Sequence, residues 1–252
     1  MTGFVSLVGA GPGDPGLLTL RGLRALQEAD VIVADRLGAR AVLDGLAAEG
    51  VTLDAEIVDV GKTPGHHAVP QDAINELLVT LAQDGKRVVR LKGGDPYVFG
   101  RGAEELEHCR AHGVDAEIVP GVTSAIAVPA IAGIPLTHRG IATSFTVVTG
   151  HDQIGEIGGG RDHTVVLLMG VGTLAHSAMV LARGERGADC PVAVVEDGFG
   201  DGQRVTIGTL ASIAHQAARR KVRSPAVVVV GDVVALSVYA PEELRASVPA
   251  SS

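Results

Sequence analysis

Short apolar runs rich in β-branched residues recur through the first half of the chain, and longer segments with helical periodicity separate them. The runs predict strands at residues 4–8, 31–34, 56–60, 88–91 and 116–119. Between them, Thr19 can cap a helix that carries Leu23 and Leu26 on one face. Residues 71–84 show the same apolar period. Strands that alternate with helices are typical of a parallel sheet joined by right-handed crossovers, so we expect an α/β lobe over residues 1–118.

Beyond residue 119 the alternation loosens, because more strands are predicted for each helix. These strands span residues 144–149, 164–168, 192–196, 204–207 and 226–230. Only two helices, at residues 174–183 and 210–219, separate them clearly. An excess of strands over helices favours a mixed sheet. We therefore expect a second α/β lobe over residues 119–244, followed by a frayed tail at 245–252.

Composition places the chain among ordinary globular proteins, since 46% of its residues are hydrophobic and 20% are charged. Aromatic residues are only 2%, so the core must be built from Val, Ile, Leu and Ala, which are typical of buried parallel sheets. A net charge of -8 argues against binding to nucleic acid or to a membrane surface, because both need a clustered basic excess. The first ten residues lack the features of a signal peptide, which predicts a cytoplasmic protein.

Cysteine and histidine positions predict neither a disulfide framework nor a metal site. Cys109 and Cys190 lie far apart in the chain. His108 and His112 flank Cys109, but no second pair of ligands completes a zinc pattern. The other conspicuous histidines are expected to make polar contacts: His66, His67, His138 and His151.

The first candidate for chemistry is the segment GAGPGD at residues 9–14, which follows the first predicted strand directly. Loops at the carboxyl ends of parallel strands face ligands, and glycines there let the backbone approach a ligand closely. A dinucleotide-binding fingerprint would need Gly or Ala where Asp14 stands, and that carboxylate would repel a pyrophosphate. The segment therefore favours a ligand other than NAD, with a tight, ligand-free turn as the alternative.

A second candidate, RLKGGDPYVFGRG at residues 90–102, also follows a predicted strand. Its four glycines and four charged residues indicate that the segment is not part of the core. It lacks the Gly-Lys-Ser/Thr ending of a nucleotide phosphate loop, so a neutral or cationic ligand held by backbone groups and Asp95 fits better. A third segment, VPGVTSA at residues 119–125, ends in Thr123 and Ser124, whose hydroxyls can cap the next helix or contact a ligand.

Together with segments further along the chain, these loops resemble the tetrapyrrole methylases, a family of class III methyltransferases that use S-adenosylmethionine. The resemblance extends from residue 5 to about residue 236. In the first half it is carried by residues 7–15, 35–37, 61–62 and 88–102. In the second half it is carried by residues 120–124, 133–139, 149–151, 169–170, 191–193, 203–204 and 224–226. The glycine block at 88–102 and the Thr137-His138-Arg139 segment are its most specific parts.

The resemblance implies two α/β lobes with a cofactor cleft between them, assembled as a homodimer. It also implies S-adenosylmethionine-dependent C-methylation of uroporphyrinogen III, with two methyl transfers that give precorrin-2 for sirohaem or cobalamin biosynthesis. The partner is then a small tetrapyrrole, and no nucleic acid, membrane or metal is expected. Three other functions stay open: a sister enzyme acting on a later corrin precursor or on a protein or RNA, an NAD-dependent oxidoreductase, and a non-catalytic nucleotide-binding module.

The same resemblance implies the site residues. Positions similar to the family's cofactor contacts are Pro12, Gly93, Gly94, Asp95, Val98, Thr123, Ser124, Met169 and Gly198. Asp35 is similar to the family's proton acceptor and Lys62 to its proton donor, although Asp35 could instead form an ion pair with Arg36 or Lys62. Lys62 could also bind a substrate carboxylate. Basic residues at or near the loops are expected to bind the carboxylates of uroporphyrinogen: Arg21, Arg36, Lys92, Arg101 and Arg139.

Overall fold

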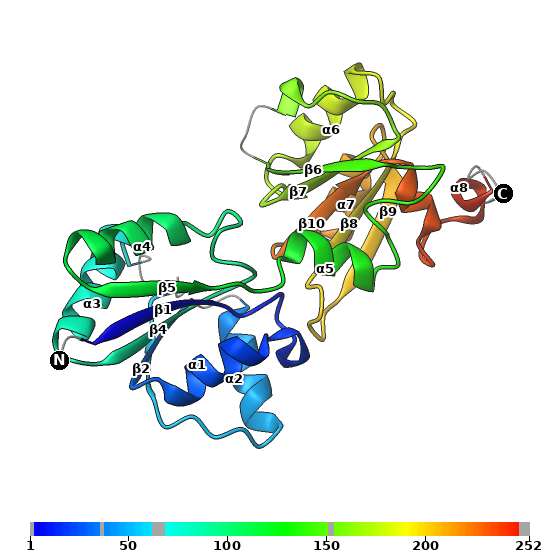
Figure 1. Ribbon diagram of the computed structural model, residues 1–252. Helices are drawn as coiled ribbons and strands as arrows, with labels where there is room; N and C mark the ends of the chain where they lie inside the picture. Colours follow the sequence, from blue (N-terminus) through cyan, green and yellow to red (C-terminus); the bar gives the residue numbers. More distant parts are fainter. Residues whose placement is uncertain (1–2, 36–37, 62–68, 151–153, 247–252) are drawn as a thin grey trace. The chain divides into compact units, whose positions relative to one another are not determined.

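The computed structural model describes residues 3–35, 38–61, 69–150 and 154–246, and the chain divides into two compact units, Met1–Thr123 and Ser124–Ser252 (Figure 1). The lobe limits expected from the sequence, 1–118 and 119–244, stay a prediction. Each unit holds one five-stranded sheet covered by helices. Along the described ranges, no helix has both the length and the apolar character needed to cross a membrane.

Unit 1 contains an all-parallel sheet of order β3-β2-β4-β1-β5. Its strands are β1 (Phe4–Gly9), β2 (Val31–Ala34), β3 (Glu56–Asp59), β4 (Arg87–Lys92) and β5 (Asp115–Val119). Its helices are η1 (Pro15–Leu17), α1 (Leu20–Glu28), α2 (Ala39–Ala48), α3 (Gln71–Gln83) and α4 (Gly102–Ala111). The order reverses at β1 and β4, the central pair. Loops at the carboxyl ends of this pair are therefore the expected place for a ligand.

Both faces of this sheet are buried, which explains why its strands are nearly continuous apolar runs. Alternate residues such as Val31 and Val33 pack toward α3 and α4, while Ile32 packs toward α1 and α2. Figure 1 shows α3 and α4 on one side of the sheet and α1 and α2 on the other. The predicted cap of α1 is confirmed, since Oγ1 of Thr19 accepts a hydrogen bond from the Gly22 amide at 3.0 Å.

Unit 2 contains the mixed sheet expected from its excess of strands, in the order β6-β7-β10-β8-β9. Its strands are β6 (Ser144–Thr149), β7 (His163–Leu168), β8 (Pro191–Glu196), β9 (Arg204–Thr209) and β10 (Ala226–Val230). Only the β6–β7 pair is parallel among these neighbours. Strand β10 is antiparallel to both β7 and β8, so β7 and β8 run in the same direction. Their carboxyl ends therefore lie at one edge of the sheet.

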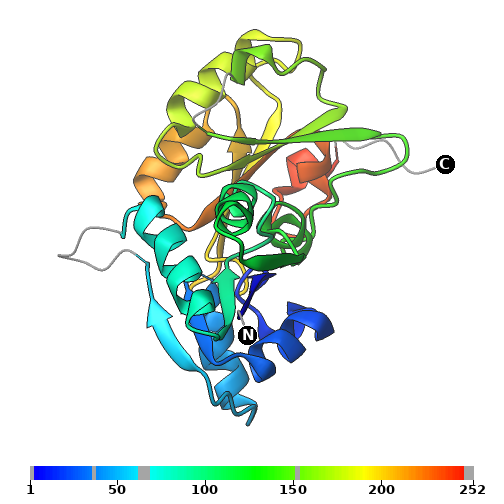
Figure 2. The same ribbon diagram turned by 60° about the vertical axis from the view of Figure 1, so that its left-hand side comes forward.

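Helices also cover both faces of the second sheet (Figure 2). They are α5 (Ser124–Ile131), η2 (Ile154–Glu156), α6 (Leu174–Arg183), α7 (Ile213–Arg220), η3 (Asp232–Leu236) and α8 (Glu242–Arg245). α6 and α7 bury Leu181 and Ile213 on one face, and α5 buries Val128 on the other. α7 begins three residues later than predicted, because residues 210–212 form a turn in which Ser212 bonds back to Thr209. η3 and α8 were not predicted from the sequence.

Candidate active site

Three glycines bring the loops of unit 1 into direct backbone contact at the carboxyl edge of the sheet. A Cβ atom at Gly121 would lie 2.3 Å from the carbonyl oxygen of Gly94 and 2.7 Å from Cα of Gly9. A Cβ at Gly9 would lie 2.5 Å from the Gly121 nitrogen. No side chain fits at such distances, so Gly9 and Gly121 are required by packing. We call Gly9, Gly94 and Gly121 the glycine contact.

Backbone hydrogen bonds extend the pairing of β1 and β4 into these loops. The Gly94 amide donates to the Gly11 carbonyl at 2.7 Å, and the Gly11 amide donates to Gly94 at 3.1 Å. Gly94 has φ of +68° and Gly11 has φ of +80°, a region that favours glycine. Gly93, the next residue toward solvent, is exposed. At Gly93 and Gly94 the turn thus has no side chains of its own.

Asp95 holds the loop after β4 to the loop after β5. Its Oδ2 accepts a hydrogen bond from the Gly121 amide at 3.0 Å, and its Oδ1 accepts one from the Tyr97 amide at 2.7 Å. The carboxylate expected from the sequence to hold a ligand is therefore already used to shape the loop. Each oxygen keeps a lone pair that could accept a further hydrogen bond.

The loop between β4 and α4 contains two non-glycine residues with positive φ. Phe99 has φ of +53° and Arg101 has φ of +59°. Such conformations cost energy and tend to occur where function requires them. Pro12 and Val98, two of the expected cofactor contacts, are half-buried in the loops after β1 and β4. Asp14 lies just beyond Pro12 and caps η1 by accepting from the Gly16 amide at 2.8 Å.

Four charged residues, three of them buried, form a group beneath these loops: Asp35, Arg90, Lys92 and Glu105. Arg90 is 2% exposed and Glu105 is fully buried. Oε1 of Glu105 accepts from Nε of Arg90 at 3.1 Å and from Nζ of Lys92 at 2.9 Å. Nη2 of Arg90 donates to Oδ1 of Asp35 at 2.6 Å. Two cations and two anions balance, and we call these residues the charge quartet.

The charge quartet places Asp35 where a proton acceptor could work. Its side chain is 35% exposed, in contrast to the three other members. Arg90 also donates to the Val33 and Leu91 carbonyls, both at 3.3 Å, so its guanidinium is fixed by β2 and β4. A rigid cation holds Oδ1 of Asp35, and no hydrogen bond to Oδ2 is seen among the residues that the structure describes.

Burial of Arg90 and Lys92 contradicts the prediction that the charged residues of the segment 90–102 lie outside the core. Both side chains lie in β4, and Lys92 is 4% exposed. Burial and the neighbouring Arg90 lower the pKa of Lys92, which its contact with Glu105 opposes. The placement favours a role for Lys92 inside the charge quartet over the substrate contact expected from the sequence. The same reasoning from sequence missed Arg90 and Glu105 as site residues.

The other basic residues expected to bind substrate occupy different surroundings. Arg21 is exposed on α1 and forms an ion pair with Glu117 of β5. Arg101 pairs with Glu104 at 2.5 Å, with both side chains about half exposed. Arg139 is exposed in a turn of unit 2 in which the His138 amide donates to the Ala142 carbonyl at 2.8 Å. Arg36 and Lys62 lie outside the described residues, as do His66, His67 and His151.

In unit 2, Met169 and Gly198 follow β7 and β8, so they lie at the same edge of the sheet. Met169 has φ of +53° and a side chain that is 53% exposed. A Cβ at Gly198 would lie 2.8 Å from two methyl groups of Val128 on α5. α5 itself begins at Ser124, another expected cofactor contact.

Gly198 also lies in a strained turn. Its neighbours Asp197 and Phe199 have φ of +45° and +71°. Unit 2 therefore has its own set of glycine-dependent, strained loops at a single sheet edge.

The chemistry of these residues suits positioning and proton transfer. Both sulfhydryls are buried, and burial raises the pKa of Cys109 to about 11 and that of Cys190 to about 12. Neither is a thiolate at neutral pH, so neither is an activated nucleophile. The carboxylate of Asp35, which is 35% exposed and held by Arg90, is a candidate base at this edge of unit 1.

Comparison with known proteins identifies the family. A family model described as Tetrapyrrole (Corrin/Porphyrin) Methylases matches residues 5–214. The chain is 51% identical over 242 residues to the S-adenosyl-L-methionine-dependent uroporphyrinogen III methyltransferase of Methanosarcina barkeri, with 93% of each chain covered. It is 48% identical over 242 residues to the uroporphyrinogen-III C-methyltransferase of Methanocaldococcus jannaschii, covering 93% of this chain and 98% of the relative.

A solved structure extends the similarity to three dimensions. The chain is similar to uroporphyrin-III C-methyl transferase from Thermus thermophilus complexed with S-adenyl homocysteine, with a TM-score of 0.73 and 40% identity. The alignment covers 92% of this chain and 93% of that one. The resemblance seen in the sequence motifs is confirmed, as is the fold of one parallel and one mixed sheet. The chain belongs to the tetrapyrrole methylase family.

Proposed function

We propose that this chain is a uroporphyrinogen-III C-methyltransferase. It moves two methyl groups from S-adenosylmethionine to uroporphyrinogen III and gives precorrin-2, a precursor for sirohaem or cobalamin. The observation that carries the proposal is 51% identity to a relative of that name over 93% of both chains. A sister enzyme acting on a later corrin precursor is the alternative, and the 26% identity to a cobalt precorrin-4 methyltransferase structure makes it the weaker one.

The loops described above suit S-adenosylmethionine. In unit 1, Pro12, Gly93, Gly94 and Val98 offer backbone groups and apolar contacts, and the glycine contact keeps side chains out. We assign the remaining cofactor contacts to Asp95, Thr123, Ser124, Met169 and Gly198. When bound, the cofactor supplies an electrophilic methyl group. The backbone strain at Met169 and beside Gly198 supports a functional reason for these conformations.

Each transfer requires a base. The pyrrole carbon of the substrate forms a bond to the methyl carbon as the bond from that carbon to sulfur breaks, and a proton must then leave the methylated ring. We assign Asp35 as the acceptor of that proton. We assign Lys62 as a proton donor, the role that the family resemblance implies. Arg90 acts as a positioning residue, because it fixes one oxygen of Asp35 without reaching the reacting atoms itself. A positioned base contributes about 10² to 10⁴-fold to the rate.

Substrate carboxylates need cations near the loops. Arg101 and Arg139 are exposed and suited to this task, and Arg21 and Arg36 are further candidates. Arg101 would exchange its ion pair with Glu104 for a substrate carboxylate at little cost, since exposed pairs contribute about 1 kcal/mol or less. We expect the protein to act in the cytoplasm as a homodimer.

The direct test is an anaerobic assay with uroporphyrinogen III and S-adenosylmethionine, followed by mass analysis of the product. We expect a doubly methylated tetrapyrrole. Titration calorimetry with S-adenosylhomocysteine and with NAD tests the cofactor separately, and only the former should bind. Binding of S-adenosylhomocysteine without methylated product would point to the sister enzyme, whereas binding of NAD alone would overturn the proposal.

A further inference from the structure

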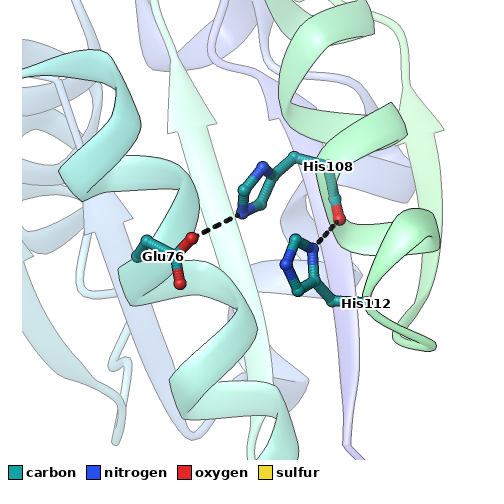
Figure 3. Close-up of side chains that lie close together, drawn as sticks. All are labelled: Glu76, His108 and His112. Carbon is teal, nitrogen blue, oxygen red and sulfur yellow. Dashed lines mark hydrogen bonds and ion pairs between the residues drawn. The ribbon is translucent and has the colours of Figure 1, made fainter.

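Three potential metal ligands meet at the contact between α3 and α4, on the outer face of unit 1. Figure 3 shows Glu76 on α3 facing His108 on α4, with His112 about one turn further along, at the residue that follows α4. One ligand atom from each of the three residues lies within 4.8 Å of the others. The two imidazole rings have centroids 4.3 Å apart. None of these residues has a part in the proposed methyl transfer.

The hydrogen bonds of the two histidines leave Nε2 of each ring available to a metal ion. Nδ1 of His112 lies 2.8 Å from the carbonyl oxygen of His108, so it carries the proton and donates. Nε2 of His112 then has a free lone pair, which is the usual arrangement in a metal-binding histidine. Nε2 of His108 lies 3.2 Å from Oε1 of Glu76, yet this buried atom has no hydrogen-bond partner among the described residues.

The donor set selects the class of metal. Two imidazole nitrogens and one carboxylate oxygen suit zinc and its neighbours, and three protein ligands leave a fourth position for water. Ligand atoms around tetrahedral zinc are about 3.3 Å apart, given bonds of about 2.0 Å. Glu76 is 63% exposed at its side chain and can rotate to close the remaining distance. Cys109 lies between the histidines in sequence, but it is buried in the apolar core of unit 1 and does not belong to this group of ligand atoms.

We propose that Glu76, His108 and His112 bind one divalent transition-metal ion of the zinc class and thereby join α3 to α4. The helices already meet through polar groups, since Nε2 of Gln71 on α3 donates to Oε1 of Glu105 on α4 at 3.0 Å. A bound ion adds a link about one turn beyond that contact, on the same two helices. Because the ligands are separate in the unfolded chain, the ion stabilises the folded state.

Zinc titration of the full chain tests this proposal by calorimetry. We expect the wild-type protein to bind one zinc ion more than the double variant His108→Gln/His112→Gln, which keeps every other histidine as background. Each single substitution, Glu76→Gln included, should weaken this site at least about 10-fold, since even outer partners of metal ligands contribute that much. Equal zinc binding by wild type and double variant would overturn the proposal.

Matched controls and a second readout separate a metal site from general effects on the surface. His176→Gln and Glu107→Gln alter an exposed histidine and an exposed acid outside the cluster, and both should bind zinc as the wild type does. Zinc should raise the melting temperature of the wild type and leave that of the double variant unchanged. A zinc-dependent rise of the same size in both proteins would contradict the proposed site.

Discussion

Arg90 links the core of unit 1 to the candidate base, because its guanidinium contacts Glu105 on one side and Asp35 on the other. Removing water from four charges is expensive, so each member depends on the others. Glu105 depends most on its partners, because its Oε1 accepts hydrogen bonds from two cations and from Gln71. Its Oε2 has no hydrogen-bond partner among the described residues.

Asp35→Asn tests the proposed base. The amide oxygen can still accept from Arg90, so the loop and cofactor affinity should persist, while basicity is lost. The single-turnover rate of methylation should fall by about 10² to 10⁴-fold. Asp44→Asn, which alters an exposed ion pair with Arg40 on α2, is the control and should leave the rate unchanged. Near-normal turnover with a lowered melting temperature would assign Asp35 a structural role.

Glu105→Gln should destabilise the fold. The substitution keeps the shape of the side chain but leaves Arg90 and Lys92 buried with only Asp35 to balance them, and breaking a buried pair costs about 3–5 kcal/mol. Urea unfolding should report that loss. Glu107→Gln, two residues further along α4 and exposed, should change the free energy of unfolding by about 0.5 kcal/mol or less. Similar values for both variants would mean that the charge quartet contributes little.

At the scale of elements, the loops of unit 1 depend on backbone proximity more than on side chains. The glycine contact and the bridge from Asp95 to the Gly121 amide join the ends of β1, β4 and β5. Substituting Gly94 would be an ambiguous test of ligand space, because its φ of +68° strains any other residue. Gly121 is better suited, since its obstacle is a neighbouring backbone.

Gly121→Ala should separate the three loops. The new methyl group would overlap the Gly94 carbonyl, and such overpacking costs about 1–3 kcal/mol. Affinity for S-adenosylhomocysteine, measured by calorimetry, should fall along with stability. Gly172→Ala adds the same methyl group where no atom lies within 4 Å, so both properties should match those of the wild type. Unchanged affinity in Gly121→Ala would place the cofactor away from this edge.

His163 connects β7 to the edge strand β6 and makes that pairing sensitive to pH. Its Nδ1 lies 2.7 Å from the Ser144 hydroxyl and its Nε2 lies 2.8 Å from the Thr146 hydroxyl. Burial, then the charge of Arg186, lowers the pKa of His163 in the folded state, opposed by Asp162. The unfolded state therefore binds more protons between the folded pKa and the ordinary value of 6.5.

It follows that the free energy of unfolding falls as pH decreases through 6.5 toward the folded pKa. His163→Gln removes this titration, so its stability should depend less steeply on pH between about 5 and 7. Urea unfolding at several pH values measures the slopes. His215→Gln, on the exposed face of α7, should keep the slope of the wild type. Parallel curves for all three proteins would contradict the assignment.

Prediction from sequence succeeded where the signal was local. Each of the ten expected strands is present in the part of the chain that the structure describes, within one or two residues of its predicted limits, because β-branched runs and glycine stops act over a few residues. The burial of Arg90 and Lys92 was not predicted, because their partner Glu105 lies on α4. Only the chain crossover after β4 brings Glu105 close to them. The contact of Glu76 with His108 could not be predicted from the sequence either, because it depends on how α3 packs against α4.

At the scale of the whole molecule, unit 2 carries exposed apolar side chains that suit self-association. Val238 is 73% exposed and Tyr239 is 52% exposed. They lie beside the end of α5, where the Ser237 hydroxyl donates to the Ala132 carbonyl at 2.6 Å and Ile131 is also exposed. Apolar groups gathered on a surface commonly mark an interface, which supports the proposed homodimer.

Light scattering at micromolar concentration should give twice the mass of one chain. Val238→Asp should shift the protein toward monomer, because a charge would be buried in the contact. Leu20→Asp places the same charge at a side chain that is equally exposed, at 73%, on α1 of unit 1, and should leave the mass unchanged. A monomeric wild-type protein would refute the homodimer, and a dimeric Val238→Asp variant would move its interface elsewhere.

The charge quartet also bears on how often the enzyme can turn over. With Asp35 ionised, its two cations and two anions cancel; once Asp35 accepts a proton, the quartet carries one net positive charge. The 35% exposure of the Asp35 side chain gives that proton a route to water. The site would therefore regenerate its own base between the first methylation and the second, without waiting for the tetrapyrrole to leave.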